Sequence, residues 1–266
     1  MSGSQWRANI ATSQVLSFAG ETMPIGGRYQ MNIERFDREV ALLEINAAQF
    51  IMIYKRWNLI IPMIEKQLKK AGLPDDFKYI PIIESALREN VSSSAGAAWL
   101  WQLMPATAQR YGVIVTSGVD ERYDVAKSTA AAIDHLKGLS SIFKQHTLVA
   151  AAYNRGAAGL QSAMKSQWTD NFYDLRMNNE TSRYIFRLLA MKYVWEHKND
   201  FFDRDSLGDM YRPFVTRNIS EKNIPDLVAR ATAHDASYYE VKKLNPRIMS
   251  NSLPEGKWNI ELFEKK

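Results

Sequence analysis

Glu84 is the residue whose neighbours are best suited to acid–base chemistry. It lies in an apolar segment, Ile80-Pro-Ile-Ile-Glu84-Ser-Ala-Leu87. In a helix, Ile80 and Leu87 share the face of Glu84, at positions i−4 and i+3. Apolar surroundings penalise the carboxylate and raise the pKa of the carboxyl group, as a general acid near neutral pH requires. Taken alone, a glutamate in such a helix is more often an exposed residue at the edge of its apolar face.

The segments that follow Glu84 carry side chains suited to binding sugars. A loop of small residues at 92–97 lets a substrate approach the backbone closely. Beyond it come amides, a thioether and a phenol, and amides and phenols are good partners for sugar hydroxyls. The candidate residues are Ser93, Gln102, Met104, Tyr153 and Asn154.

Helices are expected to position these residues, because apolar side chains recur with helical spacing. Pro62 is expected to divide a long helical stretch into two helices, and Gly72 is placed to end it as a C-cap. Pro105 indicates a break or a fresh helix start. The expected helices cover residues 37–70, 76–88, 100–111, 128–143, 147–154 and 180–197.

The composition changes near residue 200, where a polar, linker-like stretch begins. Beyond it we expect a strand at 214–219, helices at 224–233 and 237–244, and a strand at 258–263. The predicted fold is therefore mainly α, with a small α+β unit of strand–helix–helix–strand order packed on the helical part. The expected division is an N-terminal segment with helices at 1–72, a catalytic domain at 73–200, and a linker with the C-terminal unit at 201–266.

Composition removes several classes of site and partner. The 266 residues include no cysteine, so disulfides, thiolate metal sites and a cysteine nucleophile are excluded. The four histidines show no metal-binding spacing, and no phosphate-binding glycine motif occurs. A helical zinc site is therefore unsupported. The net charge of +5 suits weak attraction to a polyanion, but no motif supports nucleic-acid binding.

Membrane segments and targeting signals are not visible in the sequence. No run approaches eighteen apolar residues. The first residues have neither a charged nor an apolar leader region. Our expectation is that an export signal or lipid anchor has been removed.

Five short blocks occur in order along the chain. They are Glu84-Ser-Ala-Leu, Ser93-x-x-Gly-Ala, Leu100-Trp-Gln-Leu-Met-Pro-Ala-Thr-Ala, Ala151-Ala-Tyr-Asn and Glu180-Thr-Ser-Arg-Tyr. Together they resemble the catalytic domain of the soluble lytic transglycosylases, glycoside hydrolase family 23, which has a goose-type lysozyme-like fold. The resemblance covers about residues 62–197. The motifs that start at Gly72 and Val119 resemble more narrowly a membrane-bound branch of this family.

The resemblance implies a role for each matching residue. Glu84 falls on the single catalytic acid/base of the family. The substrate would be the glycan strands of peptidoglycan, cleaved between N-acetylmuramic acid and N-acetylglucosamine with formation of a 1,6-anhydromuramic end. No cofactor is implied. The expected location is the periplasm or the outer-membrane-associated envelope of a Gram-negative bacterium. Positions that line the family's cleft are Ser93, Gln102, Met104, Tyr153, Asn154 and Tyr184.

The sequence departs from the family pattern at Trp99 and, more mildly, in Asn154-Arg-Gly-Ala-Ala-Gly159, where the family more often has Asn-Ala-Gly-Pro-Gly. Trp99 stands where the family usually has glycine. If that glycine serves a positive φ, Trp99 is strained; if it serves clearance, the indole crowds the cleft, and Trp99→Gly would preserve or raise activity.

The C-terminal unit weakly resembles a LysM module, which in the family binds N-acetylglucosamine polymers. Its usual Gly-Asp-Thr turn is missing, so a packing role is about as plausible as glycan binding.

Two other functions stay open at this point. The same glutamate could support hydrolysis, as in goose-type lysozymes. Alternatively, the chain could be a peptidoglycan-binding protein with an impaired site, which Trp99 favours and the retained Glu84, Gln102 and Tyr153 oppose. Most glycosidases use two carboxylates, whereas the motifs supply only Glu84.

Overall fold

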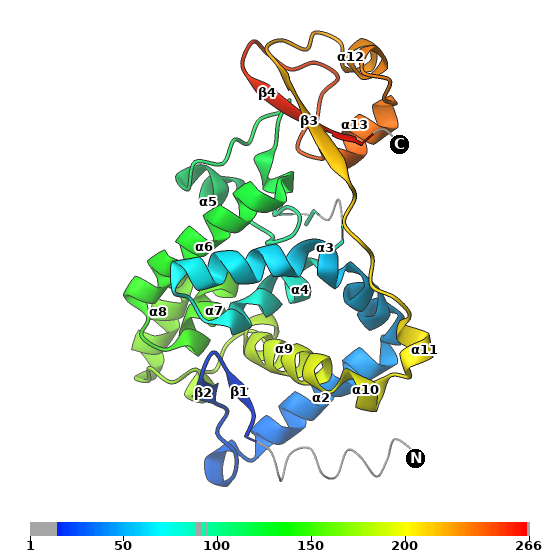
Figure 1. The fold of residues 1–266 in the computed structure, drawn as a ribbon. Helices are drawn as coiled ribbons and strands as arrows, with labels where there is room; N and C mark the ends of the chain where they lie inside the picture. Colours follow the sequence, from blue (N-terminus) through cyan, green and yellow to red (C-terminus); the bar gives the residue numbers. More distant parts are fainter. Residues whose placement is uncertain (1–14, 89–91, 94, 265–266) are drawn as a thin grey trace.

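A computed structural model describes residues 15–88, 92–93 and 95–264. Its lower part in Figure 1 is a set of packed helices, and a small unit at the top contains the last two strands. An extended segment, residues 208–215, joins the two parts along one side. The predicted mainly α fold with a strand–helix–helix–strand C-terminal unit is confirmed.

Most helices belong to the lower part, and they share one hydrophobic core. This core extends from Leu16 to Leu207, so the N-terminal helices and the helices around Glu84 pack together. The helices are α2 (Met31–Ile45), α3 (Ala47–Ala71), α4 (Tyr79–Ser85), α5 (Pro105–Arg110), α6 (Val125–Ile142), α7 (His146–Arg155), α8 (Ala157–Gln167), α9 (Asn179–Glu196), α10 (Lys198–Phe201) and α11 (Arg204–Leu207), with short 3-10 helices η1 (Gly27–Tyr29), η2 (Asp75–Lys78), η3 (Glu121–Tyr123) and η4 (Phe172–Asp174).

Helix α3 is the central helix in Figure 1, and its sequence explains why it is buried on one side. Its apolar residues recur every three or four positions, which places them on one face. On that face Trp57 stacks on Trp195 of α9, with ring centroids 3.4 Å apart. The fully or nearly buried residues of this face are Phe50, Ile53, Trp57, Ile61, Ile64 and Leu68.

The expected division at Pro62 is wrong, because α3 continues through it. An interior proline costs a helix about 3 kcal/mol, but Ile61 and Ile64 on either side are fully buried. Packing of this apolar face outweighs the lost hydrogen bond, since tertiary contacts supply most helix stability. The helical stretch divides instead at Asn46, between α2 and α3. Gly72 ends α3 as expected, in a left-handed conformation with φ of 68°.

Three further features differ from the elements expected from the sequence. The N-terminal segment, where no strand is expected, forms a hairpin of β1 (Ser17–Phe18) and β2 (Glu21–Thr22). The carboxylate of Glu21 accepts hydrogen bonds from the backbone N–H and hydroxyl of Thr147, at 2.9 and 2.7 Å, so it caps the start of α7. The helix expected at 100–111 begins only at Pro105, because residues 99–102 form turns. Helix α8 was not expected.

The C-terminal unit has its own small core and a two-stranded antiparallel sheet. Its elements are β3 (Thr216–Glu221), α12 (Leu227–Ala233), α13 (Tyr238–Leu244) and β4 (Trp258–Phe263). Val119 of the helical part is buried in this second core and pairs with Ile248 in an isolated β-bridge. The two parts are therefore joined by backbone pairing as well as by the connecting segment.

No helix in the described part of the chain combines the length and apolar character needed to cross a bilayer.

Candidate active site

Glu84 lies in the last turn of α4, immediately before the chain reverses. Helix α4 ends because Ala86 and Leu87 both adopt left-handed conformations, with φ of 53°. The hydroxyl of buried Ser85 donates to the carbonyl of Pro81 at 2.9 Å and accepts from the N–H of Leu87 at 3.1 Å. Ser85 thus fixes the turn beside Glu84, a role that the motif did not reveal.

Two side chains from α9 reach α4 at Glu84. The phenol of Tyr184 donates a hydrogen bond of 2.7 Å to Oε1 of Glu84. The guanidinium of Arg187 donates to the carbonyl of Ile83 at 2.9 Å. Because Tyr184 and Arg187 are three residues apart, they lie on one face of α9. A single helix therefore holds both the carboxyl group and the backbone that carries it.

The net effect of these surroundings is to raise the pKa of Glu84. Burial makes the largest contribution and disfavours the carboxylate, whereas the hydrogen bond from Tyr184 and the charge of Arg187 lower the pKa. The negative charge of Glu180 adds to the increase. Glu84 therefore keeps its proton to a higher pH than an ordinary glutamate, which matches the expectation from its apolar neighbours.

The two candidate tyrosines are neutral hydrogen-bond donors. Burial raises the pKa of both Tyr153 and Tyr184 well above its ordinary value, and the charge of Glu84 adds to each increase. The phenol of Tyr153 donates to the carbonyl of Trp101 at 2.7 Å. Of these two tyrosines, Tyr184 hydrogen-bonds to Glu84. Tyr153 bonds instead to the carbonyl of Trp101, in the loop that precedes α5.

That loop has an unusual backbone. Trp99 and Gln102 both have positive φ, 52° and 47°. The side-chain amide of Gln102 donates to the carbonyl of Trp99 at 2.7 Å. At the other end of the loop, exposed Ser93 accepts a hydrogen bond of 3.0 Å from the N–H of Ala97. Met104 is 42% exposed and precedes the first turn of α5.

Arg122 hydrogen-bonds to two backbone carbonyls of this loop. Its Nη1 donates to the carbonyls of Gly96 and Leu103, at 2.6 and 3.0 Å. Its Nε and Nη2 donate to the carboxylate of Asp120, and both side chains are buried. This buried ion pair lies in the Val119-Asp-Glu-Arg-Tyr123 motif. The sequence shows this motif but not its contact with the loop, which joins residues far apart in the chain.

Asn154 lies at the end of α7 and is engaged by the start of α9. Its Nδ2 donates to Glu180 at 3.0 Å, and its Oδ1 accepts from the hydroxyl of Thr181 at 3.0 Å. The structure thus brings Tyr184 of α9 against Glu84. Asn154 contacts the first turn of the same helix and so helps to position it. Glu180 is a second carboxylate near the site that motif reasoning left without a role.

Comparison with known proteins places most of this arrangement in one family. Residues 61–175 match the family described as "Transglycosylase SLT domain". This part of the chain is an SLT domain. The match includes Glu84, the loop with Trp99 and Gln102, and Tyr153, whereas Tyr184 lies beyond it.

Curated relatives agree with the SLT assignment. The chain is 30% identical over 186 residues to membrane-bound lytic murein transglycosylase D of Escherichia coli K12. That alignment covers 68% of this chain and 40% of the relative, so the chain spans about two fifths of that protein. It is also 35% identical over 80 residues to a putative tributyltin chloride resistance protein of Alteromonas sp. strain M-1, covering 30% of this chain and 39% of that protein. The narrower resemblance to a membrane-bound branch of the family is confirmed.

Two solved structures of lytic transglycosylases are similar to parts of this chain. The 70-kDa soluble lytic transglycosylase of Escherichia coli matches with a TM-score of 0.48 and 20% identity, covering 69% of this chain and 32% of that one. An inactive mutant of the Slt transglycosylase of Pseudomonas aeruginosa matches with a TM-score of 0.43 and 21% identity, covering 55% of this chain and 26% of that one.

Over the residues that the structure describes, no group of three or more His, Asp or Glu side chains is arranged to hold a metal ion.

The backbone of Trp99 is strained, because its positive φ is one that glycine adopts more readily. Its side chain is buried. Its indole is 5% exposed and stacks on Tyr123, with centroids 6.0 Å apart. Replacing a buried tryptophan by a small residue costs about 3–5 kcal/mol, and relief of the left-handed strain returns about 1–2 kcal/mol. We therefore expect Trp99→Gly to lower the free energy of unfolding by about 1–4 kcal/mol, measured by urea denaturation.

Trp168 supplies a matched control for this prediction. It has the same left-handed backbone, with φ of 53°, but its side chain is 95% exposed. Trp168→Gly should leave stability unchanged or raise it, because strain is relieved without loss of packing. A Trp99→Gly variant as stable as its parent would contradict a packing role for the indole.

Proposed function

We propose that this chain is a peptidoglycan lytic transglycosylase in which Glu84 is the single acid/base. One observation carries the proposal: a partly buried glutamate with a raised pKa, hydrogen-bonded to Tyr184, in an SLT domain. The proposed bond is the β-1,4 link between N-acetylmuramic acid and N-acetylglucosamine. The E. coli relative is named a lytic murein transglycosylase.

The proposed reaction has two proton transfers, and both involve Glu84. The protonated carboxyl group first gives its proton to the oxygen that links the two sugars, and the bond from that oxygen to C1 of the muramoyl residue breaks. The N-acetyl group stabilises the positive charge that develops at C1. The Glu84 carboxylate then takes the proton of the C6 hydroxyl as O6 bonds to C1. No water is consumed, and Glu84 ends protonated as it began.

The other candidate residues divide into two proposed roles. Ser93 and Met104 are exposed and are proposed to contact the sugar chain directly. Tyr153, Asn154 and Gln102 hydrogen-bond to other parts of the protein, so they are proposed to shape the cleft. Tyr153 donates to the carbonyl of Trp101, Asn154 bonds to Glu180 and Thr181, and Gln102 donates to the carbonyl of Trp99.

The proposed partner and location follow from this substrate. Peptidoglycan glycan strands lie in the cell envelope, and the E. coli relative is named membrane-bound. We therefore propose the periplasm or the outer-membrane-associated envelope of a Gram-negative bacterium. Subcellular fractionation of the native protein tests this, and recovery only from the cytosol would contradict it.

Tyr184→Phe should move the pH dependence of the reaction. The variant loses a hydrogen bond that lowers the pKa of Glu84, so this pKa rises further. Because the first step needs the protonated acid, activity at alkaline pH then persists to a higher pH. The measurement is the pH profile of sacculus digestion. Tyr153→Phe is the control: it removes only the bond to Trp101, so the alkaline limb should stay in place.

Turbidity of purified sacculi tests the proposed activity itself. The parent protein should clear the suspension. One observation favours a binding protein with an impaired site: the strained Trp99 lies in the same loop as Gln102. A parent that sediments with sacculi and never clears them would support that function instead.

A further inference from the structure

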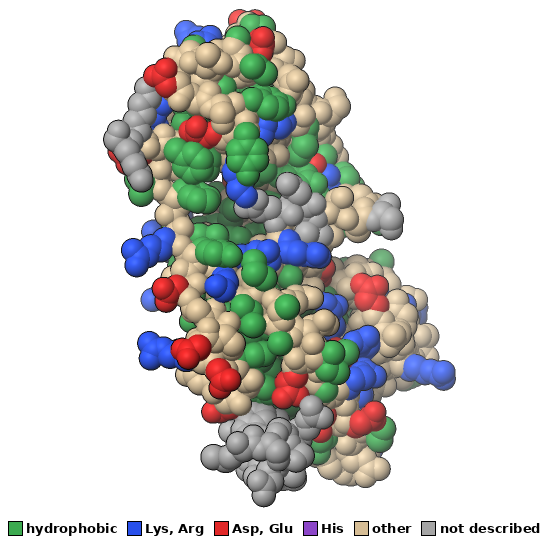
Figure 2. All heavy atoms as spheres, turned by 90° about the vertical axis from the view of Figure 1, so that its right-hand side faces the viewer, with side chains coloured by type: hydrophobic (Ala, Val, Ile, Leu, Met, Phe, Trp, Pro, Cys, Tyr) green, Lys and Arg blue, Asp and Glu red, His purple; other side chains and the backbone are tan. Residues whose placement is uncertain are grey.

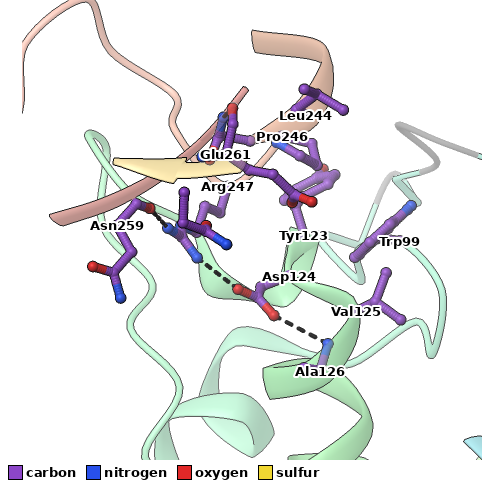
Figure 3. A pocket seen from close by; sticks show the side chains of 12 residues that line it. Trp99, Tyr123, Asp124, Val125, Ala126, Leu244, Pro246, Arg247, Asn259 and Glu261 are labelled. Atoms are coloured by element: carbon purple, nitrogen blue, oxygen red, sulfur yellow. Dashed lines mark hydrogen bonds and ion pairs between the residues drawn. The ribbon is translucent and has the colours of Figure 1, made fainter. Parts of the chain in front are cut away.

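A small pocket of about 70 Å³ lies against α4, the helix that carries Glu84. Its lining combines Glu39 of α2 with residues of α4 and α9. A larger pocket of about 410 Å³ lies between the SLT domain and the C-terminal unit, where Asp124 pairs with Arg247 (Figure 3), and Figure 2 shows the molecule hollowed between these two parts. Among the described residues, none of α2, α4 or α9 lines the larger pocket. The surroundings of the small pocket are therefore the ones that bear on the proposed acid.

Helix α9 supplies the charged and hydrogen-bonding side chains that act on Glu84. Besides burial, the groups that shift its pKa are Tyr184, Arg187 and Glu180, and all three belong to α9. Tyr153 of α7 also interacts with Glu84 through its charge, but the Tyr153 hydroxyl bonds elsewhere. A hydrogen bond weakens steeply when its angle or length departs from the optimum. A small shift of α9 along or about its axis would therefore break the bond from Tyr184 to Glu84.

Two side chains of α2 hold α9 at the residues immediately before Tyr184. The carboxylate of Glu39 accepts two hydrogen bonds from the guanidinium of Arg183, at 2.7 and 2.8 Å. The guanidinium of Arg35 donates to the carbonyl of Ser182 at 2.6 Å. Because Arg35 and Glu39 are four residues apart, they share one face of α2. That face contacts two successive residues of α9.

These contacts restrain both the position and the rotation of α9. Glu39 is 3% exposed, and a two-pronged bond between Arg183 and a carboxylate fixes orientation as well as distance. The guanidinium of Arg35 also lies over the ring of Phe186, 4.1 Å from its centroid. Helix α2 therefore contacts α9 on both sides of Tyr184 in the sequence.

We propose that Glu39 and Arg35 are positioning residues for Glu84, which act by holding Tyr184 of α9 against it. The inference rests on the proposed function for the reaction that Glu84 performs. Both α2 and Tyr184 lie outside residues 61–175, the part of the chain that matches the SLT family. The acid of the matched part is thus completed by one helix that precedes this part and one that follows it.

The test measures the pKa of Glu84 by carbon-13 NMR titration of its side-chain carboxyl signal, which is assigned from its absence in Glu84→Gln. In Glu39→Gln and in Arg35→Met, the pKa should rise toward its value in Tyr184→Phe, because the hydrogen bond that lowers it is weakened. The two variants remove charges of opposite sign, so a direct electrostatic effect would shift the pKa in opposite directions. In the Tyr184→Phe background, neither change should shift it further.

Lys192→Met is the matched control on the same helix. Lys192 pairs with Asp76 at 2.7 Å, and both side chains are largely buried. The contact lies about two turns of α9 from Tyr184. Lys192→Met should therefore lower the midpoint of urea denaturation and leave the pKa of Glu84 in place.

Several outcomes overturn the inference. They are an unchanged pKa of Glu84 in both α2 variants, shifts of opposite sign, an equal shift in Lys192→Met, and a further shift in the Tyr184→Phe background. If circular dichroism shows that Glu39→Gln does not fold, Arg35→Met with and without Tyr184→Phe decides the outcome.

Sacculus digestion is measured separately, because the NMR titration needs no substrate. In both α2 variants, the alkaline limb of the digestion profile should move to higher pH, as in Tyr184→Phe. Digestion by the parent protein without a pKa shift in these variants removes this inference alone. A pKa shift in a protein that never digests sacculi removes the proposed activity and leaves the contact of α2 with the Tyr184–Glu84 pair established.

Discussion

Glu84→Gln is expected to reduce sacculus digestion by at least the ~10²–10⁴-fold that acid–base catalysis contributes. The amide keeps the size of the side chain and can still accept the hydrogen bond from Tyr184. It cannot give up or take a proton, and both transfers in the proposed mechanism pass through this group. The measurement is the initial rate of muropeptide release at equal protein concentration.

Stability provides the folding control for this variant. The raised pKa means that folded Glu84 binds more protons than the unfolded chain, whose ordinary value is 4.5. This contribution to stability is fully present below that value and is lost as the pH rises through the folded pKa. Glu84→Gln should therefore gain stability relative to the parent as the pH rises from 4 to 7. An unfolded variant would make the activity loss uninformative, and circular dichroism detects this.

Glu180→Gln separates a one-carboxylate mechanism from a two-carboxylate one. The change removes a negative charge that raises the pKa of Glu84, so the alkaline limb of the pH profile should move to lower pH. Activity at the new optimum should stay well above that of Glu84→Gln. An equal loss in both variants would show that the reaction needs two carboxyl groups.

Arg122→Ala is expected to lower the free energy of unfolding by about 3–5 kcal/mol, because it leaves Asp120 buried without its positive partner. The same change frees the carbonyls of Gly96 and Leu103, which the Arg122 guanidinium holds. Urea denaturation measures the stability. Activity should also fall in conditions where the variant stays folded, because the loop that carries Gln102 loses its support.

Lys137→Ala is the matched control for the ion pair. Lys137 and Asp134 are 3.5 Å apart, and their side chains are 49% and 57% exposed. Exposed ion pairs of this kind contribute little to stability, so the free energy of unfolding should change by no more than about 0.5 kcal/mol. Equal effects of Arg122→Ala and Lys137→Ala would contradict the role given to the buried pair.

Helices with a clear apolar face were predictable from sequence, and those whose stability depends on distant contacts were not. The spacing of apolar residues from Phe50 to Leu68 indicates α3, but the helix boundary predicted at Pro62 is wrong. The cost of an interior proline is visible in the sequence, whereas the packing that outweighs it is not. Helix α8 has only Leu160 and Ala163 buried, so its sequence lacks a strong apolar face. The hairpin at Glu21 depends on contacts with α7, 126 residues away.

At the candidate site, the sequence predicts the apolar surroundings of Glu84 better than its contacts. The apolar neighbours of Glu84 indicated a raised pKa, which the structure supports. The hydrogen bond to Tyr184 joins residues 100 positions apart, and local spacing carries no information about such a pair. The contact of Arg122 with the carbonyl of Gly96 spans 26 positions, so local spacing does not predict it either.

The mass of the muropeptides released from purified sacculi tests the central claim most directly. The account predicts products with 1,6-anhydromuramic ends, each lighter by one water than the hydrolysed product, and almost none from the Glu84→Gln variant. Release by the parent of muropeptides with ordinary reducing ends would contradict it, because water would then have taken the place of the C6 hydroxyl.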